Sequence, residues 1–268
     1  MKRIISIPKI ALLSLTCSFT AASLSGQIFS EDFQTGYSVG DLMNQQDWTA
    51  GVGTNKSPTP HVALDNGNYF IQAQPGDDTR ALLQAGNFGL SNSDTITLTF
   101  DLRVSASDSN AGFGVGIFNP DVGSIGTTPH IGVQAGNWIV RGWSFGDSSP
   151  ARDSSGSAIG PTEGDWYRVQ SEWTLSGAGT ATLWVKNLTE GETAFTQLFF
   201  NAAQDQTTAT LNLDDPNNTG AQNWDGVFTR NRDSSIDNLT VVPEPATYAL
   251  LLGLTGLALV TLRRYRRR

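Results

Sequence analysis

Ile96-Thr-Leu-Thr-Phe-Asp-Leu-Arg-Val104 is a stretch in which apolar and polar residues alternate without a break. Successive side chains of a β-strand point to opposite faces of a sheet, so this alternation predicts a strand with one buried and one solvent-facing side. A helix would instead repeat its apolar residues three or four positions apart. The strand therefore belongs to a sheet that packs against a core on one face.

Shorter segments of the same kind lie on both sides of this stretch. They cover residues 69–73, 112–118, 131–134, 138–143, 166–175, 180–187 and 235–242. Short turns join the third segment to the fourth and the fifth to the sixth, so each pair is predicted to form a hairpin. Residues 40–46 are expected to form one short turn of helix. Short strands separated by Gly, Asn, Asp and Ser predict an all-β fold, an antiparallel β-sandwich or a barrel.

The N-terminal end of the chain differs from this region in composition. Residues 1–25 begin with Met-Lys-Arg, continue through an apolar stretch and end in small residues, which is the layout of a secretory signal peptide. Signal peptidase is expected to cut after Ala22, Ser23 or Ser25. The single cysteine, Cys17, lies in this segment, so the mature chain has no disulfide. Residues 27–242 remain as one large domain.

The C-terminal residues 243–268 carry three features in order, beginning with the triplet Pro243-Glu244-Pro245. Residues 246–262 contain no charge, and a helix of this length reaches about 25 Å, the short end of what crosses a bilayer core. Arg263, Arg264 and three further arginines would hold this end on the cytoplasmic side. A final transmembrane helix in this orientation places the preceding domain outside the cytoplasm.

This layout resembles the PEP-CTERM sorting signal of bacteria that make exopolysaccharide. The resemblance implies that an exosortase, a membrane protease-transpeptidase, recognises the triplet and removes the tail. The helix would then anchor the chain in the inner membrane only until processing, and the mature protein is expected at the cell surface or in the extracellular matrix. The alternative is a permanent membrane anchor with a chance Pro-Glu-Pro.

Charge is divided unevenly between the ends and the domain. The chain has 17 basic and 25 acidic residues, for a net charge of −8. The signal peptide and the tail hold eight of the basic residues but only one acidic residue, so the domain carries about −15. Such a charge argues against nucleic acid and anionic membrane surfaces as partners, and it is compatible with divalent cations and neutral sugars. The alternative is that the charge serves only to keep the domain soluble.

Three stretches of the domain resemble a known family. They are residues 31–48, the string Gly-Asp-Trp-Tyr-Arg-Val-Gln at 164–170, and Ile-Asp-Asn-Leu-Thr-Val at 236–241. In this order they are similar to the opening, a central strand and the closing strand of concanavalin A-like jelly rolls, the LamG-like domains of exported bacterial proteins. The resemblance implies a jelly-roll β-sandwich whose first and last strands lie side by side.

Residues suited to catalysis are scarce. His61 and His130 are the only histidines, and each is expected in a loop beside proline, which leaves little material for a metal site or a Ser-His-Asp site. Glycosidases of the resembled fold carry Glu-x-Asp-x-x-Glu on one strand. The nearest string here, Glu163-Gly-Asp165-Trp-Tyr-Arg168, ends in arginine, which cannot give and take a proton near neutral pH. The domain is therefore expected not to be an enzyme.

The resemblance also implies a calcium ion that ties the first strand to the last, since Ca²⁺ takes six to eight oxygen ligands. Glu31 and Asp32 lie on the expected first strand, and Asp237 lies on the last. Alternation places Asp237 on the side of Leu239 and Val241 unless a bulge intervenes, and an inward carboxylate needs a partner. A solvent-facing Asp237 is the alternative.

Seven tryptophans lie in the domain, of which Trp48 and Trp173 are expected in the core. An exposed indole is a flat apolar plate that can cover a sugar ring. Four tryptophans are therefore candidates for carbohydrate binding: Trp138, Trp143, Trp184 and Trp224. Trp184 alternates with Leu183 and Val185, so it should point away from their side. The alternative is that these rings pack under loops or against the second sheet.

Two functions from different classes fit the sequence. The first is an exported, non-catalytic cell-surface or matrix protein that binds extracellular polysaccharide and is processed at its tail. The second is a secreted carbohydrate-active enzyme, a glycoside hydrolase or lyase, with an unrecognised site. A structural spacer without a ligand is a third.

Overall fold

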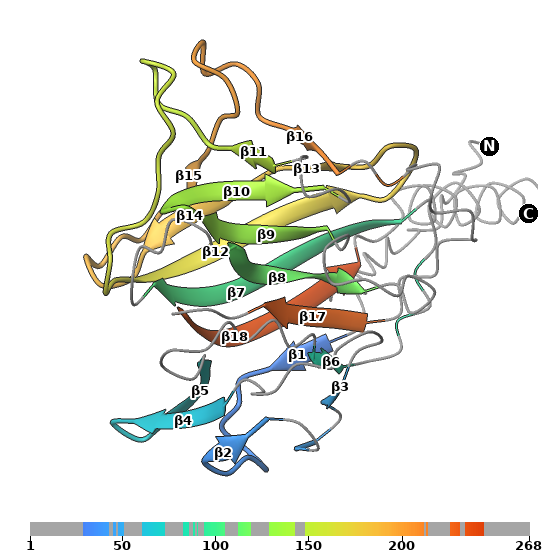
Figure 1. Cartoon of the computed structure of the whole chain (residues 1–268), viewed down its shortest axis with the longest axis vertical. Helices are drawn as coiled ribbons and strands as arrows, with labels where there is room; N and C mark the ends of the chain where they lie inside the picture. The colour runs from blue at the N-terminus through green and yellow to red at the C-terminus, as the bar shows by residue number, and fades with distance from the viewer. Residues whose placement is uncertain are drawn as a thin grey trace, which may run out of the picture.

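The computed structural model shows a domain built from β-strands (Figure 1). The residues that it describes are 29–42, 45–46, 48–50, 61–72, 83–85, 88, 90, 94–104, 112–118, 129–142, 148–211, 213, 226–230 and 234–243. Within these ranges there is no helix, and every strand pairing is antiparallel.

Eleven strands form the larger sheet, named here the first sheet. Its main path runs β15 (Thr196–Gln197), β14 (Trp184–Asn187), β12 (Trp166–Thr174), β7 (Thr95–Val104), β18 (Ser234–Pro243), β5 (Asn68–Gln72), β4 (His61–Asp65), β2 (Gly40–Asp41). Three further strands pair beside this path: β1 (Phe29–Glu31), β13 (Thr180–Ala181) and β16 (Ala209–Thr210). The alternating stretch quoted first is thus β7, which lies between β12 and β18 near the middle of the sheet.

Seven strands form the second sheet. Their order is β11 (Ser148–Pro150), β10 (Asn137–Arg141), β9 (His130–Gln134), β8 (Gly112–Phe118), β17 (Gly226–Arg230), β6 (Leu83–Ala85), β3 (Thr49–Ala50). Figure 1 shows β8, β9 and β10 stacked in front of β7, β12 and β14, so the two sheets face each other. The arrangement is an antiparallel β-sandwich, as the sequence predicts.

One hydrophobic core fills the space between the sheets. The inward residues of β7 are at most 2% exposed, and so are their counterparts Val115, Ile131 and Val133 on the second sheet. Trp48 and Trp173 are 1% and 0% exposed, which confirms that both belong to the core. Burial of these faces supplies most of the driving force for the fold.

The first and last strands lie side by side, as the family resemblance implies. Phe29 of β1 pairs with Val241 of β18, and Glu31 pairs with Leu239. Further along the same edge of β18, Ser235 pairs with Gln72 of β5. β18 therefore joins the N-terminal strands to the centre of the sheet.

The predicted hairpins are confirmed, and their turns have a physical basis. β9 and β10 are joined by Ala135 and Gly136, whose φ values of 50° and 74° give the two positive angles that match the twist of a two-residue hairpin. β12 is followed by β13 and β14, which both pair with it.

Two local predictions are wrong. Residues 40–46 are not a helical turn at their start, because Gly40 and Asp41 pair with Val62 and His61 as strand β2. The two histidines are not in loops, because His61 begins β4 and His130 begins β9. At the two histidines, strand pairing overrides the local signal of the preceding proline.

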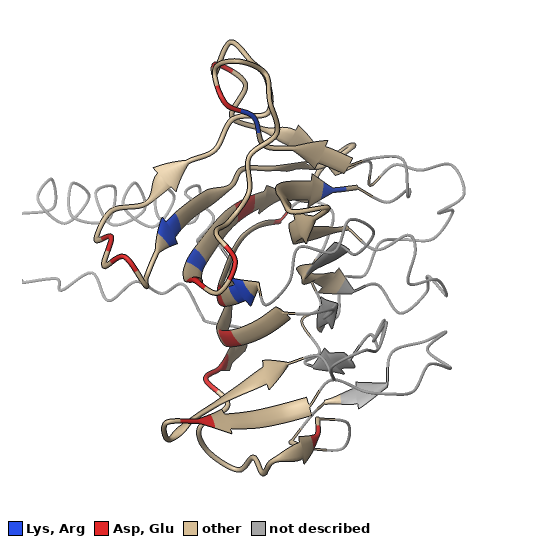
Figure 2. Ribbon diagram, turned by 60° about the vertical axis from the view of Figure 1, so that its left-hand side comes forward, with Lys and Arg blue, Asp and Glu red and all other residues tan. Residues whose placement is uncertain are grey.

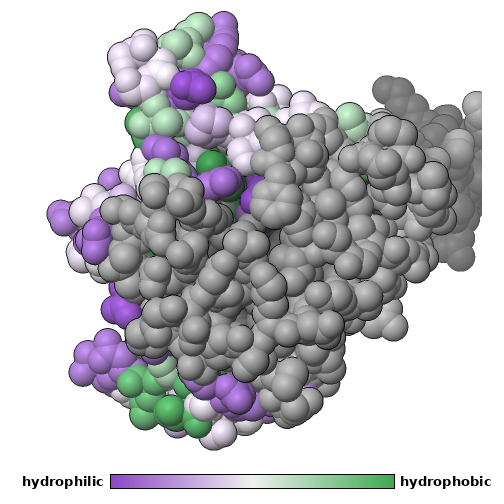
Figure 3. Space-filling model, viewed as in Figure 1, coloured by the Kyte–Doolittle hydropathy of each residue, from purple (hydrophilic) through white to green (hydrophobic). Residues whose placement is uncertain are grey.

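The described surface shows little apolar area. Its exposed large hydrophobic residues are Val39 and Leu64, which are 64% and 49% exposed. Figure 3 shows apolar (green) atoms at the lower end of the molecule, where β2 lies. Small apolar patches of this kind are ordinary on a protein surface.

Candidate functional site

A row of polar residues crosses the middle of the first sheet on the face that points away from the second sheet, called here the outer face. Asp101 of β7 is the register partner of Asp237 on β18 and of Arg168 on β12. Arg168 in turn faces Lys186 on β14. Figure 2 shows the acidic and basic segments next to one another on neighbouring strands. Because Phe100 and Leu102 point into the core, Asp101 has to point outward.

A bulge in β18 sets the direction of Asp237. The register between β18 and β7 shifts between Asp237 and Thr240, and Asn238 has a positive φ of 49°. One extra residue lets both Ile236 and Leu239 point into the core at 0% exposure. Asp237 therefore lies on the outer face, and the inward placement expected from simple alternation is wrong.

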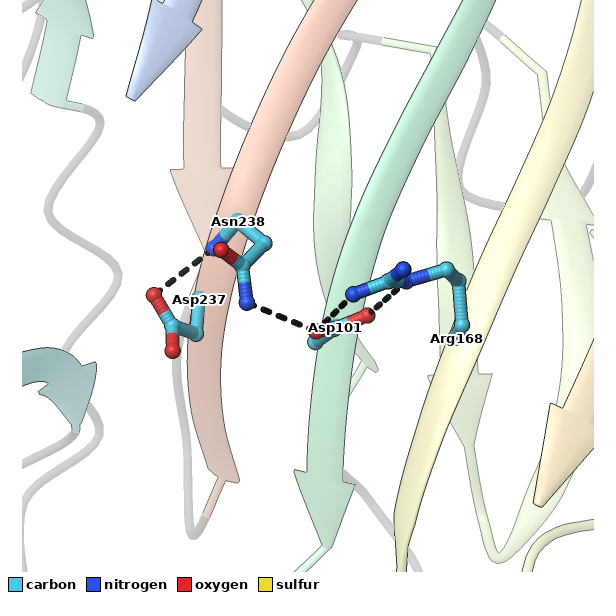
Figure 4. A network of polar contacts seen from close by, with 4 residues as sticks. All are labelled: Asp101, Arg168, Asp237 and Asn238. Carbon is cyan, nitrogen blue, oxygen red and sulfur yellow. Dashed lines mark hydrogen bonds and ion pairs between the residues drawn. The ribbon is translucent and has the colours of Figure 1, made fainter. Parts of the chain in front are cut away.

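Asp101 is held by three hydrogen bonds (Figure 4). Arg168 donates from Nε to Oδ1 and from its terminal amino group to Oδ2, both at 2.7 Å. Asn238 donates from its side-chain amide to Oδ2 at 2.8 Å. Asp101 is only 4% exposed, and burying an unpaired carboxylate costs free energy. The bidentate ion pair with Arg168 offsets this cost. The bonds from Arg168 connect β12 to β7 at the outer face, and the bond from Asn238 connects β18 to β7.

Asp237 is the carboxyl group of this row that titrates unusually. Burial raises its pKa from the ordinary value of 3.8 to about 6, and the neighbouring charges of Asp101 and Asp32 add to the rise. The backbone N–H of Asn238, at 2.7 Å from Oδ1, and the Arg168 cation act in the opposite direction. The same Asp101–Arg168 contact raises the pKa of Arg168, chiefly through its hydrogen bonds. Near neutral pH Asp237 is an ionised carboxylate in a place that disfavours its charge.

A pocket of about 430 Å³ lies over this row. Asp101, Asp237 and Asn238 are part of its lining. The turn of the β4–β5 hairpin contributes Asp65, Asn66 and Asn68, and the segment after β14 contributes Leu188 and Thr189. The turn is an Asn66-Gly67 pair with φ values of 52° and 89°, the geometry that a two-residue hairpin needs. Polar groups from distant parts of the chain thus converge on one hollow.

Two aromatic side chains complete the lining. Trp166 and Phe70 pack edge to face with their ring centroids 5.8 Å apart. The guanidinium of Arg103 lies 5.1 Å from the Trp166 ring and 5.4 Å from the Phe70 ring, within the range of cation–π attraction. Arg103 therefore braces both rings on the outer face, where Trp166 is half-buried.

The four tryptophans predicted to bind carbohydrate have different positions. Trp184 is half-buried and alternates with the buried Leu183 and Val185, so its predicted direction is confirmed and it lies on the outer face. Trp138 is 3% exposed and packs edge to face against Tyr167 in the core, which corrects its assignment as a platform. Trp143 and Trp224 lie outside the described residues.

The three predicted calcium ligands do not form one group. Glu31 accepts hydrogen bonds from the Phe33 backbone and the Tyr37 hydroxyl, and Asp32 accepts one from the Gln34 backbone. Asp237 lies on the outer face, and nowhere in the described ranges do three His, Cys, Asp or Glu side chains cluster as for a metal. Calcium binding stays a prediction, which a comparison of melting temperatures in EDTA and in millimolar calcium would check.

The string nearest to the glycosidase motif, residues 163–168, is the start of a strand. Glu163 is exposed, Gly164 has a φ of 89°, and Asp165 accepts a hydrogen bond from the Asn187 side chain at 2.8 Å. These residues form the turn that leads into β12. Two members of the string belong to the candidate site: Trp166 lines the pocket, and Arg168 donates to Asp101 beside it.

The sorting-signal residues lie almost wholly beyond the described part. Pro243 ends β18, whereas Glu244, Pro245, Arg263 and Arg264 lie outside the described residues, as do residues 1–25 and 246–262. In the ranges that the structure covers, no helix has the length and apolar character needed to span a bilayer.

Comparison with known proteins identifies the C-terminal segment. Residues 241–268 match the family model of the PEP-CTERM protein-sorting motif. This motif marks exported proteins that an exosortase processes at the cell surface, so export and processing follow for this chain. A comparison with curated protein sequences finds no match.

Several solved structures are similar in fold. A xylan β-1,4-xylosidase from Bacillus halodurans C-125 shares 12% identity at a TM-score of 0.45, over 68% of this chain and 34% of the xylosidase. Cellulose induced protein Cip1 shares 14% sequence identity at a TM-score of 0.43, over 80% of this chain and 96% of Cip1. The catalytic domain of a glycoside hydrolase family 131 protein from Coprinopsis cinerea shares 10% sequence identity at a TM-score of 0.43, over 80% of this chain and 93% of that domain. The chain spans about a third of the xylosidase, and likenesses at this level carry no argument about function.

Sequence reasoning missed most of the pocket. Asp101, Asn238, Trp166 and Phe70 were not singled out, and Arg168 was considered only as a replacement for a catalytic acid. One signal was available: an aspartate in the middle of a strand is unusual, and it needs a partner if it is buried. The partners themselves depend on the register between strands.

Proposed function

We propose that this protein is a non-catalytic glycan-binding protein of the cell surface or extracellular matrix, and that its sugar site is the outer-face pocket. Before processing, the segment 246–262 anchors it in the inner membrane; afterwards the domain is released to its final location. The observation that carries the proposal is the convergence of Trp166 with carboxylate, amide and hydroxyl groups in a hollow of about 430 Å³.

This combination suits a sugar better than other small molecules. A pyranose has an apolar face that packs on an aromatic ring, and hydroxyls at its edge that need donors and acceptors. Trp166 offers the ring, while Asn66, Asn68 and Thr189 offer the polar groups. The volume lies at the small end of ligand sites, which fits one or two sugar units.

The state of the carboxylates supports binding over hydrolysis. Hydrolytic enzymes of the two-carboxylate type need both groups free to act on the bond, about 5 Å apart in the retaining case. Asp101 and Asp237 are register partners, but the oxygens of Asp101 are occupied by Arg168 and Asn238. That leaves Asp237 as the half-buried carboxyl of the row without such a clamp. The pocket's other carboxyl group, Asp65, is exposed in the β4–β5 hairpin and does not belong to the row.

A glycan array with the full-length protein tests the proposal, followed by affinity measurements on the best ligand. Trp166→Ala should weaken binding about 10- to 100-fold without unfolding, as for other stacked rings. Trp184→Ala is the matched comparison, because it removes a half-buried indole from the same face outside the pocket. If only Trp184→Ala weakens binding, the sugar lies on the open sheet and the pocket assignment is wrong.

Two results would reject the wider proposal. The first is that no glycan on the array is retained. The second is that the wild-type protein releases reducing sugar from a polysaccharide and Asp237→Asn abolishes the release, which would make the domain an enzyme.

A further inference from the structure

The pocket has an unbalanced charge. Asp65, Asp101 and Asp237 line it, whereas the described residues of its lining include no lysine or arginine. Arg168 lies beside Asp101 and donates two hydrogen bonds to it. Arg103, two residues along β7 from Asp101, has its guanidinium 5.1 Å from the Trp166 ring and 5.4 Å from the Phe70 ring. A ligand in this hollow therefore meets two carboxylates, those of Asp65 and Asp237, that no cation of the lining pairs with.

Asp237 is placed to meet such a ligand directly. Its Oδ1 accepts the backbone N–H of Asn238, and within the described residues its other oxygen receives no hydrogen bond. The charged groups around it are Asp101 on β7, Asp32 after β1, Arg168 on β12 and, across the pocket, Asp65. Three of these four are acidic. A cationic group on the ligand would remove the repulsion among them, whereas a uronic acid would increase it.

An ammonium group fits this place better than a metal ion. A divalent cation needs several oxygen ligands in one cluster, and the described residues contain no such cluster. An ammonium needs hydrogen-bond acceptors on one side only and can be carried by the sugar itself. Resting on the function proposed above, we propose that the pocket binds a hexosamine unit with a free amino group, with its ammonium on the Asp237 carboxylate and its ring on Trp166.

The inference can be tested with two matched probes, a fully deacetylated and a fully N-acetylated tetrasaccharide of β-1,4-linked glucosamine. The full-length protein should bind the deacetylated probe at least about tenfold more tightly at pH 7, since a hydrogen bond between charged groups is the stronger kind. Below the pKa of Asp237, at about 6, the carboxylate is protonated, so this preference should shrink at pH 5. Binding of the acetylated probe should change little between the two pH values.

Two substitutions separate a local contact from the general charge of the domain. Asp237→Asn keeps the shape of the side chain and should reduce the preference to about twofold or less. Glu172→Gln removes a half-buried carboxylate from the outer face of β12, outside the pocket, and should preserve the preference. Melting curves of both variants establish that they are folded.

The outcomes distinguish this inference from the function on which it rests. Equal binding of the two probes, or tighter binding of the acetylated one, overturns the amino-sugar inference and leaves glycan binding intact. An equal loss of preference in both variants also overturns it, because the effect would then be long-range. If neither probe nor any other glycan binds, both proposals fail.

Discussion

Asp237, which is proposed above to hold a ligand, acts against the stability of the fold at neutral pH. Its carboxylate is half-buried, faces acidic neighbours and has a pKa raised to about 6. A group whose pKa is higher in the folded than in the unfolded chain favours the folded state when it is protonated. Stability is therefore reduced as the pH rises from about 4 to about 6, the reverse of the usual behaviour of a paired aspartate.

Replacing this group should relieve the cost. Asp237→Asn should be more stable than the wild type by about 1–3 kcal/mol at pH 7, and nearly equal to it at pH 4, because each pKa unit corresponds to about 1.4 kcal/mol. Urea unfolding at the two pH values measures the difference. Glu163→Gln, which removes an exposed carboxylate, is the control for the loss of one negative charge. A variant less stable than the wild type at pH 7 would contradict the argument.

Arg168 has the opposite role, since its removal leaves Asp101 buried with a single donor. Arg168→Gln should lower the free energy of unfolding by about 2–4 kcal/mol. Lys186→Gln is a suitable control: it removes the neighbouring cation in the same row, whose ammonium lies 4.9 Å from the Phe195 ring, and should cost under about 1 kcal/mol. Adding Asp101→Asn to Arg168→Gln should recover part of the loss, because the buried charge is then gone. No recovery would mean that the pair contributes through packing alone.

At the scale of the element, the bulge in β18 decides which side chains reach the outer face. It depends on Asn238, whose φ of 49° lies in the left-handed region that asparagine tolerates better than most residues. The same side chain donates to Asp101, so one residue supplies both the backbone geometry and the contact across to β7.

Substitutions at Asn238 should separate these two contributions. Asn238→Gly keeps the backbone conformation and loses the side-chain hydrogen bond, for an expected cost of about 1 kcal/mol. Asn238→Val loses the hydrogen bond and adds left-handed strain for a β-branched residue, so it should cost about 1–2 kcal/mol more. Thermal unfolding of the two variants measures the gap. Equal stabilities would show that the bulge does not constrain this residue.

At the scale of the whole molecule, the sequence predicted the sandwich but not the pocket. The alternation in 96–104 is local information, and it identified the inner and outer faces of β7 correctly. The Asp101–Arg168 pair joins residues 67 positions apart, and it exists only because β7 and β12 pair in one register. The bulge at Asn238 inverted the expected direction of Asp237, since one inserted residue moves a side chain to the other face.

Burial of aromatic residues shows the same division. The direction of Trp184 followed from its neighbours in the chain. That of Trp138 did not, because it lies near the start of its strand, close to a turn, and is covered by residues such as Tyr167 from the other sheet. A pattern of period two gives the face on which a side chain lies, but not what covers that face.

The sorting motif leads to a prediction about the mature protein. Because residues 241–268 carry the signal, protein isolated from the surface of producing cells should lack its tail. Mass spectrometry of peptides from that material checks this. Peptides that extend to Arg268 in the mature surface protein would show that the tail is a lasting anchor.

The last strand also limits how the tail can be reached. β18 ends at Pro243, which pairs with Ile96, and the matched motif begins at residue 241. Pro243 therefore belongs both to the last strand and to the Pro-Glu-Pro triplet, with no linker between the two. An enzyme that binds the triplet must therefore come into close contact with the sandwich, unless the end of β18 first separates from β7. Ten Gly/Ser residues inserted between Val242 and Pro243, which leave the triplet intact, should therefore speed tail removal in cells, as followed by pulse-chase. An unchanged rate would mean that the sandwich offers no obstruction to the exosortase.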